Sequence, residues 1–559
     1  MGLNEIASRI PFDPVGRLSD AAFEVKILAE AGILAPIRPD KLAKMVAKYA
    51  KWGASPATGA ILTAINRPDD TAILDEKGSL TFKQVDLRSN ALAHALEQRG
   101  VEPGKGVGIM CRNHRGFVDA TLAAAKLGAS SLYLNTAFAG PQLAEVMERE
   151  GPQVLIYDEE FTDLLQGIDE SVPRIVAWSE GGTGGDSTID ELIDDSDESE
   201  LSAPEESARF VILTSGTTGT PKGAQRSNPE GLMSVAALLD KIPFRARETI
   251  MVAAPLFHSW GFTHFVMGLS TGSTLVLRRK FDPEGTVKAI EENRAQVLAV
   301  VPVMMQRILE RGEETISSYD TSSLRITSAS GSALPGELAT RWMDTFGDNL
   351  YNLYGSTEVA YATIATPEDL RAAPGTAGRP PRGTVVKLYD PDGNPVGKGE
   401  TGRIFVGNDM SFEGYTGGGG KDQIDGLLSS GDVGHFDEDG RLFIDGRDDE
   451  MIVSGGENVF PREVEDLLSD HEAINEAAVI GVKDDKFGQR LKAFVVTAEG
   501  RDASEDELKS HVKANLARYK VPREVEFLDE LPRNATGKVV KRKLVEREEE
   551  AGREATAGG

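Results

Sequence analysis

The sequence has a single cysteine and a shortage of positive charge. Cys111 is the one cysteine among 559 residues, which excludes an intramolecular disulfide and argues against a structural zinc site of the usual kind. The chain carries 61 lysine and arginine residues against 89 aspartate and glutamate residues, a net charge of −28. Nonspecific nucleic-acid binding needs a basic surface, so we expect no nucleic-acid partner.

The sequence also lacks a long apolar run and a secretory leader. No run approaches the roughly 18 to 20 apolar residues that span a bilayer. Residues 1–14 have neither the charged region nor the apolar region of a signal peptide. We therefore expect a cytoplasmic protein, and a chain of this length predicts two or more domains.

The first 55 residues precede any α/β pattern and are predicted to form a helical extension. Leu42, Met45, Tyr49 and Trp52 recur at helical spacing. A parallel stripe consists of Lys41, Lys44, Lys48 and Lys51. Two interpretations stay open for residues 39–53. The helix packs on its own domain with solvated lysines, which is the commoner arrangement, or it lies on an anionic membrane surface.

From Thr71 onward, short apolar runs alternate with segments of helical length. Residues 71–75 are predicted to form a strand, and residues 81–99 a helix that begins with the capping box Thr81-x-x-Gln84. Further strands are expected at 107–111, 131–134, 154–157, 210–213, 250–254, 274–277, 297–301 and 324–328. Strands separated by helices predict largely parallel sheets, whose ligands bind at the carboxyl ends of the strands.

Changes in composition suggest where the domains divide. The Gly-, Ser- and acid-rich residues 181–206 are expected to be an exposed, mobile loop. A charged, hinge-like stretch at 446–449 is the better boundary. We predict a helical extension over 1–55, a large domain over 56–447, a small α+β domain over 448–545 and a disordered tail over 546–559.

The motif around which the chain is organised is a loop rich in glycine and hydroxyl residues that follows strand 210–213. Residues 214–223 read T-S-G-T-T-G-T-P-K-G. Its glycines let backbone N–H groups approach an anion, and Lys222 adds a positive charge, so polyphosphate is the expected ligand. A Walker-type loop is excluded by spacing, because Gly216 and Gly219 are three residues apart and Lys222 follows a proline.

This loop resembles the signature of the adenylate-forming superfamily, which comprises acyl-CoA synthetases, luciferases and peptide-synthetase adenylation domains. Further motifs similar to those of the family follow in the expected order: P-L-F-H (255–258), S-G-S-A (330–333), Y-N-L-Y-G-S-T-E (351–358), G-D-V-G (431–434), G-R-D-D (446–449), S-G-G-E-N (454–458) and T-G-K (536–538). The resemblance implies an α/β fold with a large N-terminal domain of stacked α/β subdomains and a small, mobile α+β C-terminal domain.

The resemblance also implies a role for each motif. The catalytic residues would be Lys538, His258 and Lys222, with His258 as a positioning group and Asp449 as the hinge. Glu358 and Thr214 would hold the metal. The implied ATP and AMP site comprises Thr214, Ser215, Gly216, Thr217, Thr218, Gly219, Lys222, Gly331, Ser332, Ala333, Asn352, Tyr354, Gly355, Thr357, Asp432, Arg447 and Lys538. CoA would contact Ser454, Gly455, Gly456 and Glu457, and the acyl pocket would comprise His258, Gly261, Val303, Gly331 and Ala360.

The activity implied by the resemblance is that of an AMP-forming acyl-CoA synthetase that uses ATP, Mg²⁺ and CoA. Small residues at Gly261, Gly331 and Ala360 would leave room for a long tail, and the segment 134–140 with the N-terminal extension looks like actinobacterial fatty-acyl-CoA synthetases. A medium- to long-chain fatty acid is therefore the expected substrate. The alternatives are a fatty acyl-AMP ligase that loads a carrier protein, and a CoA ligase for an aromatic or branched acid. The sequence carries no signal for an oligomeric state.

Overall fold

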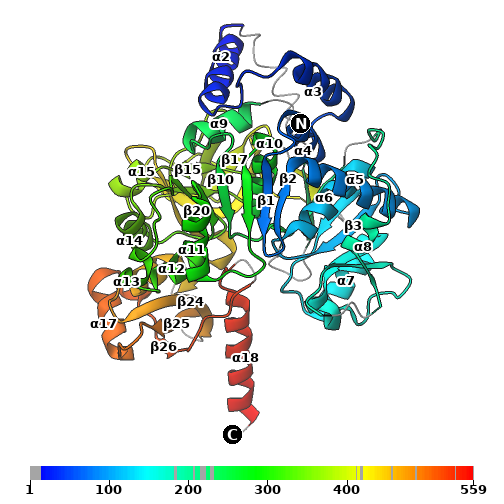
Figure 1. Cartoon of the computed structure of the whole chain (residues 1–559). Helices are drawn as coiled ribbons and strands as arrows, with labels where there is room; N and C mark the ends of the chain where they lie inside the picture. Colours follow the sequence, from blue (N-terminus) through cyan, green and yellow to red (C-terminus); the bar gives the residue numbers. More distant parts are fainter. Residues whose placement is uncertain are drawn as a thin grey trace.

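In the part of the chain that the structure describes, four β-sheets are covered by helices (Figure 1). The computed structural model describes residues 14–181, 185–205, 208–214, 222–226, 232–410, 412–415, 420–454, 457–484, 488–534 and 537–557. Within these ranges, strands that are neighbours in a sheet are often not consecutive in the sequence, so the sheets are assembled from distant segments. The arrangement is the large N-terminal domain with a small C-terminal domain that the resemblance implies.

The first eight-stranded sheet is parallel except at its two outer strands. Its order is β15-β14-β13-β12-β10-β11-β1-β2. Its strands are β1 (Thr71–Asp75), β2 (Gly78–Thr81), β10 (Thr249–Val252), β11 (Thr274–Leu277), β12 (Val297–Val300), β13 (Ile326–Ala329), β14 (Leu350–Tyr354) and β15 (Thr363–Ala365). Parallel strands buried on both faces read as continuous apolar runs, which is why the sequence pattern locates them within a few residues.

The second eight-stranded sheet has the order β18-β9-β8-β4-β3-β5-β6-β7. Its strands are β3 (Gly106–Met110), β4 (Ser130–Tyr133), β5 (Val154–Asp158), β6 (Arg174–Trp178), β7 (Ser187–Thr188), β8 (Phe210–Thr214), β9 (Lys222–Arg226) and β18 (Phe412–Tyr415). Phe117 and Phe265 meet edge to face with ring centroids 6.0 Å apart. Phe117 belongs to a helix that covers this sheet, and Phe265 belongs to a helix that covers the first sheet. The core therefore lies between the two sheets.

Helices cover the large domain. They are α4 (Pro56–Asn66), α5 (Phe82–Gln98), α6 (Arg115–Leu127), α7 (Gly140–Glu150), the 3₁₀ segment η1 (Glu159–Leu165), α8 (Ile189–Asp194), α9 (Met233–Lys241), α10 (Ser259–Thr271), α11 (Pro283–Asn293), α12 (Pro302–Leu309), α13 (Glu313–Ser317), α14 (Gly336–Phe346) and α15 (Pro367–Ala372). The predicted capping box of α5 is present, because the hydroxyl of Thr81 accepts from the backbone N–H of Gln84 and the Gln84 side chain accepts from Thr81.

Two smaller sheets follow. A five-stranded antiparallel sheet completes the large domain and consists of β16 (Val385–Tyr389), β17 (Gly402–Gly407), β19 (Gln423–Ile424), β20 (Leu427–Phe436) and β21 (Leu442–Arg447). After η2 (Asp448–Glu450), the small domain contains β22 (Ile452–Ser454), β23 (Glu457–Val459), α16 (Pro461–Ser469), β24 (Ile474–Asp484), β25 (Gly488–Thr497), α17 (Glu505–Asn515), η3 (Arg518–Lys520) and β26 (Glu524–Phe527). This is an α+β arrangement.

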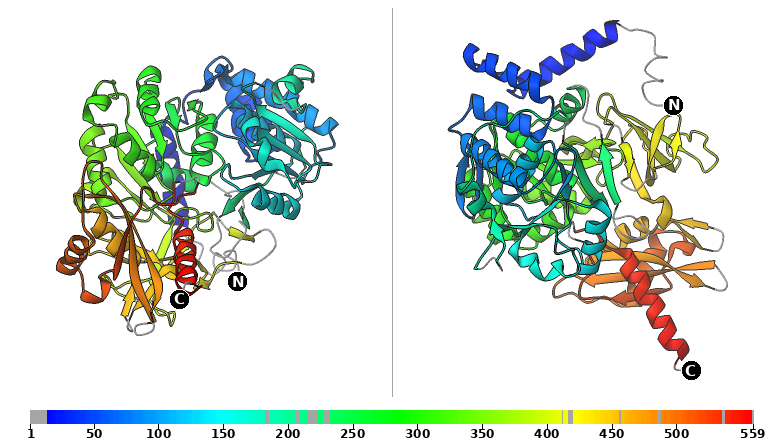
Figure 2. Two further views of the ribbon diagram at one scale, coloured as in Figure 1. Left: turned by 90° about the horizontal axis from the view of Figure 1, so that it is seen from below. Right: turned by 90° about the vertical axis from the view of Figure 1, so that its right-hand side faces the viewer.

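The N-terminal residues form two helices, α2 (Pro14–Glu30) and α3 (Pro39–Trp52), which lie on the side of the molecule away from the C-terminus (Figures 1 and 2). The inner face of α3 packs on α4: Trp52 is buried beside Ile61, and Lys41 donates to the carbonyl of Asn66. Its outer face leaves Leu42 and Val46 exposed. The predicted apolar stripe is thus divided between a packed face and a solvent face.

The structure corrects two expectations about loops. Residues 181–206 were expected to be a mobile loop, yet they contain β7 and α8, because Ile189 is buried and Asp190 pairs with Arg88 and Lys77. The tail 546–559 was expected to be disordered, yet α18 (Lys541–Ala557) extends from the small domain (Figure 1).

The beginning of α18 is held by packing and by ion pairs. Leu544 is buried against side chains of β24 and β25. Farther along, Lys492 pairs with Glu548, and Arg547 lies 2.7 Å from Glu526. None of the helices in the described part of the chain is both long enough and apolar enough to span a membrane.

Candidate functional site

The predicted site residues come together because three parallel strands end at the same edge of the first sheet. The carboxyl end of β10 leads to His258, that of β13 leads to Gly331, and that of β14 leads to Glu358. The residues after these strands line a cavity of about 1890 Å³ between the large and small domains. Predicted residues that line it are His258, Val303, Gly331, Ser332, Ala333, Asn352, Tyr354, Gly355, Thr357, Glu358, Ala360, Asp432, Arg447 and Lys538.

Part of the predicted site falls on residues that are not described. Ser215, Gly216, Thr217, Thr218, Gly219, Gly455 and Gly456 lie outside the described residues. The structure describes Thr214, Lys222, Asp449, Ser454 and Glu457 through their backbone. Thr214 and Lys222 are paired at the ends of the antiparallel strands β8 and β9, so the two ends of the predicted phosphate loop lie side by side. The roles assigned to all these residues stay predictions.

A chain of hydrogen bonds fixes the predicted ribose-binding carboxylate. The hydroxyl of Tyr354 donates to Oδ2 of Asp432 at 2.6 Å and lies 3.1 Å from Oγ of Ser430. Arg447 donates from Nη1 to the other oxygen of Asp432 at 3.2 Å. Burial and the neighbouring Asp432 raise the pKa of Tyr354 well above its usual value, so the phenol stays a donor. Each oxygen of Asp432 keeps a lone pair with which to accept a ligand hydroxyl.

Small side chains and one buried amide form the neighbouring wall. Gly331 has φ +96, and a Cβ there would lie 3.3 Å from Val301, so the turn after β13 favours glycine. Asn352 is 6 % exposed, and its Oδ1 has no hydrogen-bond partner among the described residues. A buried acceptor without a partner is costly, and it is suited to a ligand N–H.

Glu358 has the surroundings of an ionised metal ligand. Its Oε1 accepts from the Tyr415 hydroxyl at 2.7 Å, and its Oε2 accepts from Oγ of Ser356 at 2.8 Å. Burial alone would raise the pKa of Glu358, but these two hydrogen bonds and the charge of Lys421 outweigh it and leave the pKa below its usual value. Each oxygen retains a lone pair, and an ionised carboxylate is a ligand that Mg²⁺ prefers. Glu358 therefore fits the metal role.

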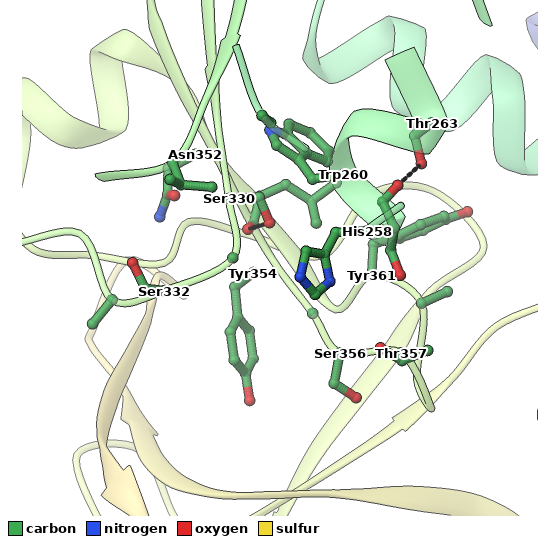
Figure 3. Close-up of a pocket in the computed structure, with 18 of the residues that line it drawn as sticks. His258, Trp260, Thr263, Ser330, Ser332, Asn352, Tyr354, Ser356, Thr357 and Tyr361 are labelled. Atoms are coloured by element: carbon green, nitrogen blue, oxygen red, sulfur yellow. Dashed lines mark hydrogen bonds between the residues drawn. The ribbon is translucent and has the colours of Figure 1, made fainter. Parts of the chain in front are cut away.

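His258 lies at the centre of the cavity wall at the start of α10. Figure 3 shows its ring between Tyr354 on one side and Ser356 and Tyr361 on the other. Burial lowers the pKa of His258 to about 4, so the imidazole is neutral at pH 7. Its Nε2 is buried and has no hydrogen-bond partner within the described ranges. A neutral ring with an unused nitrogen can position a ligand by one hydrogen bond, as expected for a positioning group.

The small domain brings Lys538 to the same cavity. The side chain of Asn534 accepts from the backbone N–H of Lys538 at 2.9 Å, which closes the turn before it. Gly537 has φ +79, and a Cβ there would collide with Val303 of the large domain. Gln306 and Asn475 join the two domains by a hydrogen bond of 2.9 Å. Close packing at Gly537 therefore holds Lys538 at the cavity beside Val303 of the large domain.

The predicted acyl pocket needs one correction. Gly261 does not line the cavity, because it faces the backbone of Pro255, with which a Cβ would collide. Glycine is required there so that the first turn of α10 can pack on the preceding loop. The cavity wall along α10 is formed instead by larger residues, among them Phe262 and Val266.

Sequence reasoning missed further residues of the site. Tyr415 and Lys421, which act on Glu358, and Ser430, which contacts Tyr354, line the cavity but were assigned no role. The S-G-D sequence containing Ser430 was the one available signal. Tyr415 and Lys421 are distant from Glu358 in the chain and are brought to it by the fold.

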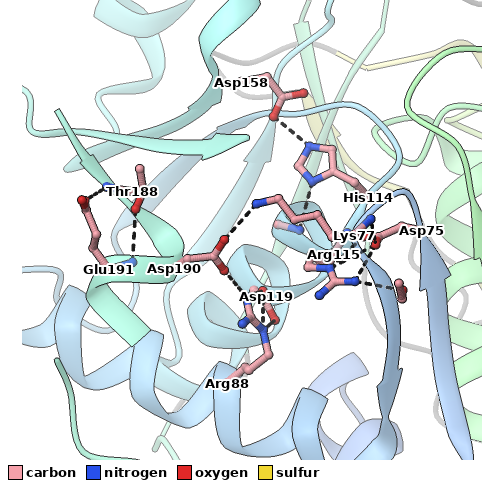
Figure 4. A network of polar contacts seen from close by, with 12 residues as sticks. Asp75, Lys77, Arg88, His114, Arg115, Asp119, Asp158, Thr188, Asp190 and Glu191 are labelled. Atoms are coloured by element: carbon pink, nitrogen blue, oxygen red, sulfur yellow. Dashed lines mark hydrogen bonds and ion pairs between the residues drawn. The ribbon is translucent and has the colours of Figure 1, made fainter. Parts of the chain in front are cut away.

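A second cluster of potential ligands is structural. Cys111, His114 and Asp158 lie close together and are buried. The ring of His114 donates from Nε2 to Asp158 at 2.8 Å and accepts the N–H of Gly116 at its other nitrogen, at 3.0 Å (Figure 4). Burial raises the pKa of Cys111 well above its usual value, so the thiol stays protonated. The cluster orients the start of α6 and leaves no histidine nitrogen for a metal.

Comparison with known proteins identifies the class. The family model described as AMP-binding enzyme matches residues 63–416, and the model of the AMP-binding enzyme C-terminal domain matches residues 463–538. The chain therefore belongs to the family of AMP-binding enzymes, the adenylate-forming superfamily whose motifs it resembles. It is an AMP-forming acid–CoA ligase, and it uses ATP, Mg²⁺ and CoA.

Individual relatives act on different acids. The chain is 34% identical over 493 residues to an indoleacetate–CoA ligase from Aromatoleum aromaticum, covering 86% of this chain and 96% of that protein. It is 28% identical to a fatty acid–[acyl-carrier-protein] ligase, ScoC, from Streptomyces coeruleorubidus, covering 87% and 94%. Among solved structures, the anthranilate CoA ligase AuaEII in complex with anthranoyl-AMP matches with a TM-score of 0.80 and 26% identity, covering 88% and 97%.

Proposed function

We propose that this ligase activates a carboxylic acid with a long apolar tail, a medium- to long-chain fatty acid, and transfers the acyl group to CoA. The observation that carries this proposal is the extent of the cavity beyond His258. It continues along α10, where Phe262 and Val266 line it together with Ile212 and Leu238.

The shape of this part suits a chain better than a ring. Residues that line it occur along α10 from its first turn to Thr271 at its end. A helix rises about 1.5 Å per residue, so this wall is about 18 Å long. An aromatic acid such as indoleacetate or anthranilate, which the relatives' names include, would occupy only the part of the cavity next to His258. Burial of each additional methylene contributes about 0.8 kcal/mol, which favours the longer acid.

The residues at the other end would carry the first half-reaction. A carboxylate oxygen of the acid attacks the α-phosphorus of ATP, the bond to the bridging oxygen breaks, and pyrophosphate leaves. Lys538 and Lys222 offset the negative charge where the two anions meet, and neutral His258 orients the acid. Glu358 would hold Mg²⁺, which when bound supplies further positive charge at the phosphates. Asp432 and Arg447 would hold the ribose, and Asn352 would accept from the adenine amino group.

In the second half-reaction the CoA sulfur attacks the carbonyl carbon, the bond from that carbon to the phosphate oxygen breaks, and AMP leaves. We propose that the small domain turns at Asp449 for this step, which withdraws Lys538 and brings the segment from Ser454 to Glu457 beside the thiol. The boundaries 56–447 and 448–545 would then separate the two moving bodies.

The test is a CoA-dependent assay with acids from acetate to oleate, together with indoleacetate and ferulate. We expect AMP release to require CoA, and kcat/KM to rise about fourfold per methylene as the chain lengthens. A maximum with an aromatic acid would contradict the fatty-acid proposal. Adenylate formation without acceleration by CoA would favour the acyl-AMP ligase alternative, with a carrier protein as the acceptor.

We also propose peripheral membrane contact through residues 39–53. The outer face of α3 leaves Leu42, Val46 and Tyr49 47%, 61% and 54% exposed, and Lys44 and Lys51 are exposed on the same helix. Each lysine near an anionic surface contributes about 1 kcal/mol at low salt. We expect sedimentation with anionic vesicles but not with zwitterionic ones, and a loss of this binding in Val46→Asp. Equal recovery with both vesicles would contradict this contact.

A further inference from the structure

The apolar cavity does not end within the residues that the family model matches. That match begins at residue 63, whereas the cavity continues to residues that precede it. Among them are Leu28, Leu34, Tyr49, Ser55 and Gly59. They belong to the end of α2, to α3 and to α4, together with the segments that join these helices. The N-terminal helices are therefore part of the cavity wall.

Helix α9 packs on α2 and supplies another part of the cavity wall in this region. Val235 and Leu238 of α9 line the cavity together with Leu28. The end of α2 is fastened to the body, because the carbonyl of Ala31 accepts from the backbone N–H of Ala246 at 2.7 Å. The beginning of α2 is fastened as well, because Arg382 donates to Asp20 at 2.9 Å. Helix α2 is thus anchored to the rest of the large domain at two places.

Large apolar side chains are exposed where this end of the cavity meets the solvent. Leu34, Tyr49 and Leu232 are 52%, 54% and 52% exposed, and all three line the cavity. They come from three different segments of the chain, the loop after α2, helix α3 and the residue before α9. Exposed apolar residues gathered around a cavity mark a binding site rather than a random surface. This end of the cavity is an apolar mouth, at the opposite end of α10 from His258.

We propose that α2, α3, the first turns of α4 and α9 form a distal subsite that holds the methyl end of the acyl tail. Its mouth admits tails that are longer than the cavity, while ATP and CoA use the polar end. This inference rests on the proposed fatty-acid substrate. Because the mouth is open, kcat/KM rises with chain length and then reaches a plateau, without falling for the longest acids.

The test blocks the distal subsite with Val235→Trp and compares it with Val46→Trp. Val235 is 38% exposed and lines the cavity, whereas Val46 is 61% exposed and does not line it. We expect Val235→Trp to lower the ratio of kcat/KM for palmitate to that for octanoate by on the order of a hundredfold, since about four methylenes lose their contacts. Val46→Trp should keep the wild-type ratio.

A binding measurement separates failure of this inference from failure of the proposed function. Displacement of parinaric acid, a fluorescent 18-carbon fatty acid, is measured in the full-length protein without ATP. If palmitate displaces the probe equally well from the wild type and from Val235→Trp, the distal subsite is wrong while the fatty-acid proposal stands. If no fatty acid binds the wild type, the proposed function is wrong. Weaker displacement from Val235→Trp alone supports the inference.

Discussion

At the polar end of the cavity, where we propose that the nucleotide binds, side chains are held by short hydrogen bonds, whereas at the proposed acyl end, apolar side chains are held by packing alone. Tyr354, Asp432 and Glu358 each have a partner within about 3 Å. Phe262, Val266 and Val235 line the other end as parts of helices. Directional bonds set the position of single atoms, and packing sets only the shape of a space.

This difference indicates which positions of the cavity can be substituted without loss of catalysis. A substitution at the polar end leaves a buried partner unsatisfied, which costs about 1–3 kcal/mol or more. A substitution at the apolar end changes the length or width of the space, and the neighbouring helices can adjust. The names of the relatives include indoleacetate, anthranilate and fatty acid. This variety of acids is consistent with one polar end joined to different acyl ends.

The largest expected effect is that of Lys538→Ala. Removing the positive charge of Lys538, which lines the cavity from the small domain, should lower the rate of adenylate formation by about 10²–10³-fold, because charge at the transferring phosphate is no longer offset. Thioester formation from a preformed acyl-adenylate should change far less. The control is Lys543→Ala, at an exposed position near the start of α18, which should match the wild type. Equal loss in both half-reactions would contradict the role given to Lys538.

Glu358→Gln should have the next largest effect. The amide keeps the shape of the side chain but removes the charge, so we expect about a hundredfold lower rate at 1 mM Mg²⁺, with partial recovery as Mg²⁺ is raised. The assay is pyrophosphate release over a Mg²⁺ titration. Glu337→Gln is the matched control, because Glu337 also lines the cavity and pairs with Arg341 on its own helix. A Mg²⁺ dependence unchanged from the wild type would remove Glu358 from the metal site.

Tyr415→Phe tests whether the hydrogen-bond partner of Glu358 affects metal binding, as the comparison of the two ends of the cavity implies. Loss of the 2.7 Å hydrogen bond should raise the Mg²⁺ concentration for half-maximal rate by about tenfold, while the maximum rate changes little. The pKa of Glu358 should also rise toward its usual value, since that hydrogen bond is the largest of the contributions that lower it. The activity of the variant should therefore fall at a higher pH on acidification than that of the wild type. Identical profiles would show that Tyr415 only packs.

The fold was predictable where one segment carries its own signal. The buried strands and the capping box at Thr81 depend on neighbours in the sequence, and they appear within a few residues of the expected positions. Helix α8 was missed because its charged residue Asp190 is paired with Arg88 and Lys77, which come from distant segments. Helix α18 was missed for the same reason, because its stability depends on contacts with β25 and β26.

The site divides in the same way. Motifs located Tyr354, Glu358 and Asp432 because each needs one residue type at one spacing. The acyl end has no such requirement, since any apolar residue of suitable size can line it. Gly261 was assigned there on size alone and proved to be needed for backbone packing. The contribution of Leu28 and Val235 could not be seen before the fold was known, because α2 and α9 meet only in three dimensions.

The smallest expected effect concerns α10, the helix that both ends of the cavity share. Burial lowers the pKa of His264 to about 4, while its Nδ1–H donates to the carbonyl of Trp260 at 2.9 Å. In the unfolded chain this histidine is protonated below about pH 6.5, whereas in the native protein it stays neutral down to about pH 4. The free energy of unfolding therefore falls as the pH falls through this window.

His264→Phe removes this uptake while keeping a flat ring between Phe244 and Trp260. Between pH 7.5 and 5.0 we expect the variant to lose about 2 kcal/mol less of its free energy of unfolding than the wild type, as measured by urea unfolding with tryptophan fluorescence. His258 has the same lowered pKa and should leave a similar slope in both proteins, which is why the difference between them is the informative quantity. Parallel pH profiles would mean that the ring at position 264 is protonated in the native state, and that α10 admits water between the two ends of the cavity.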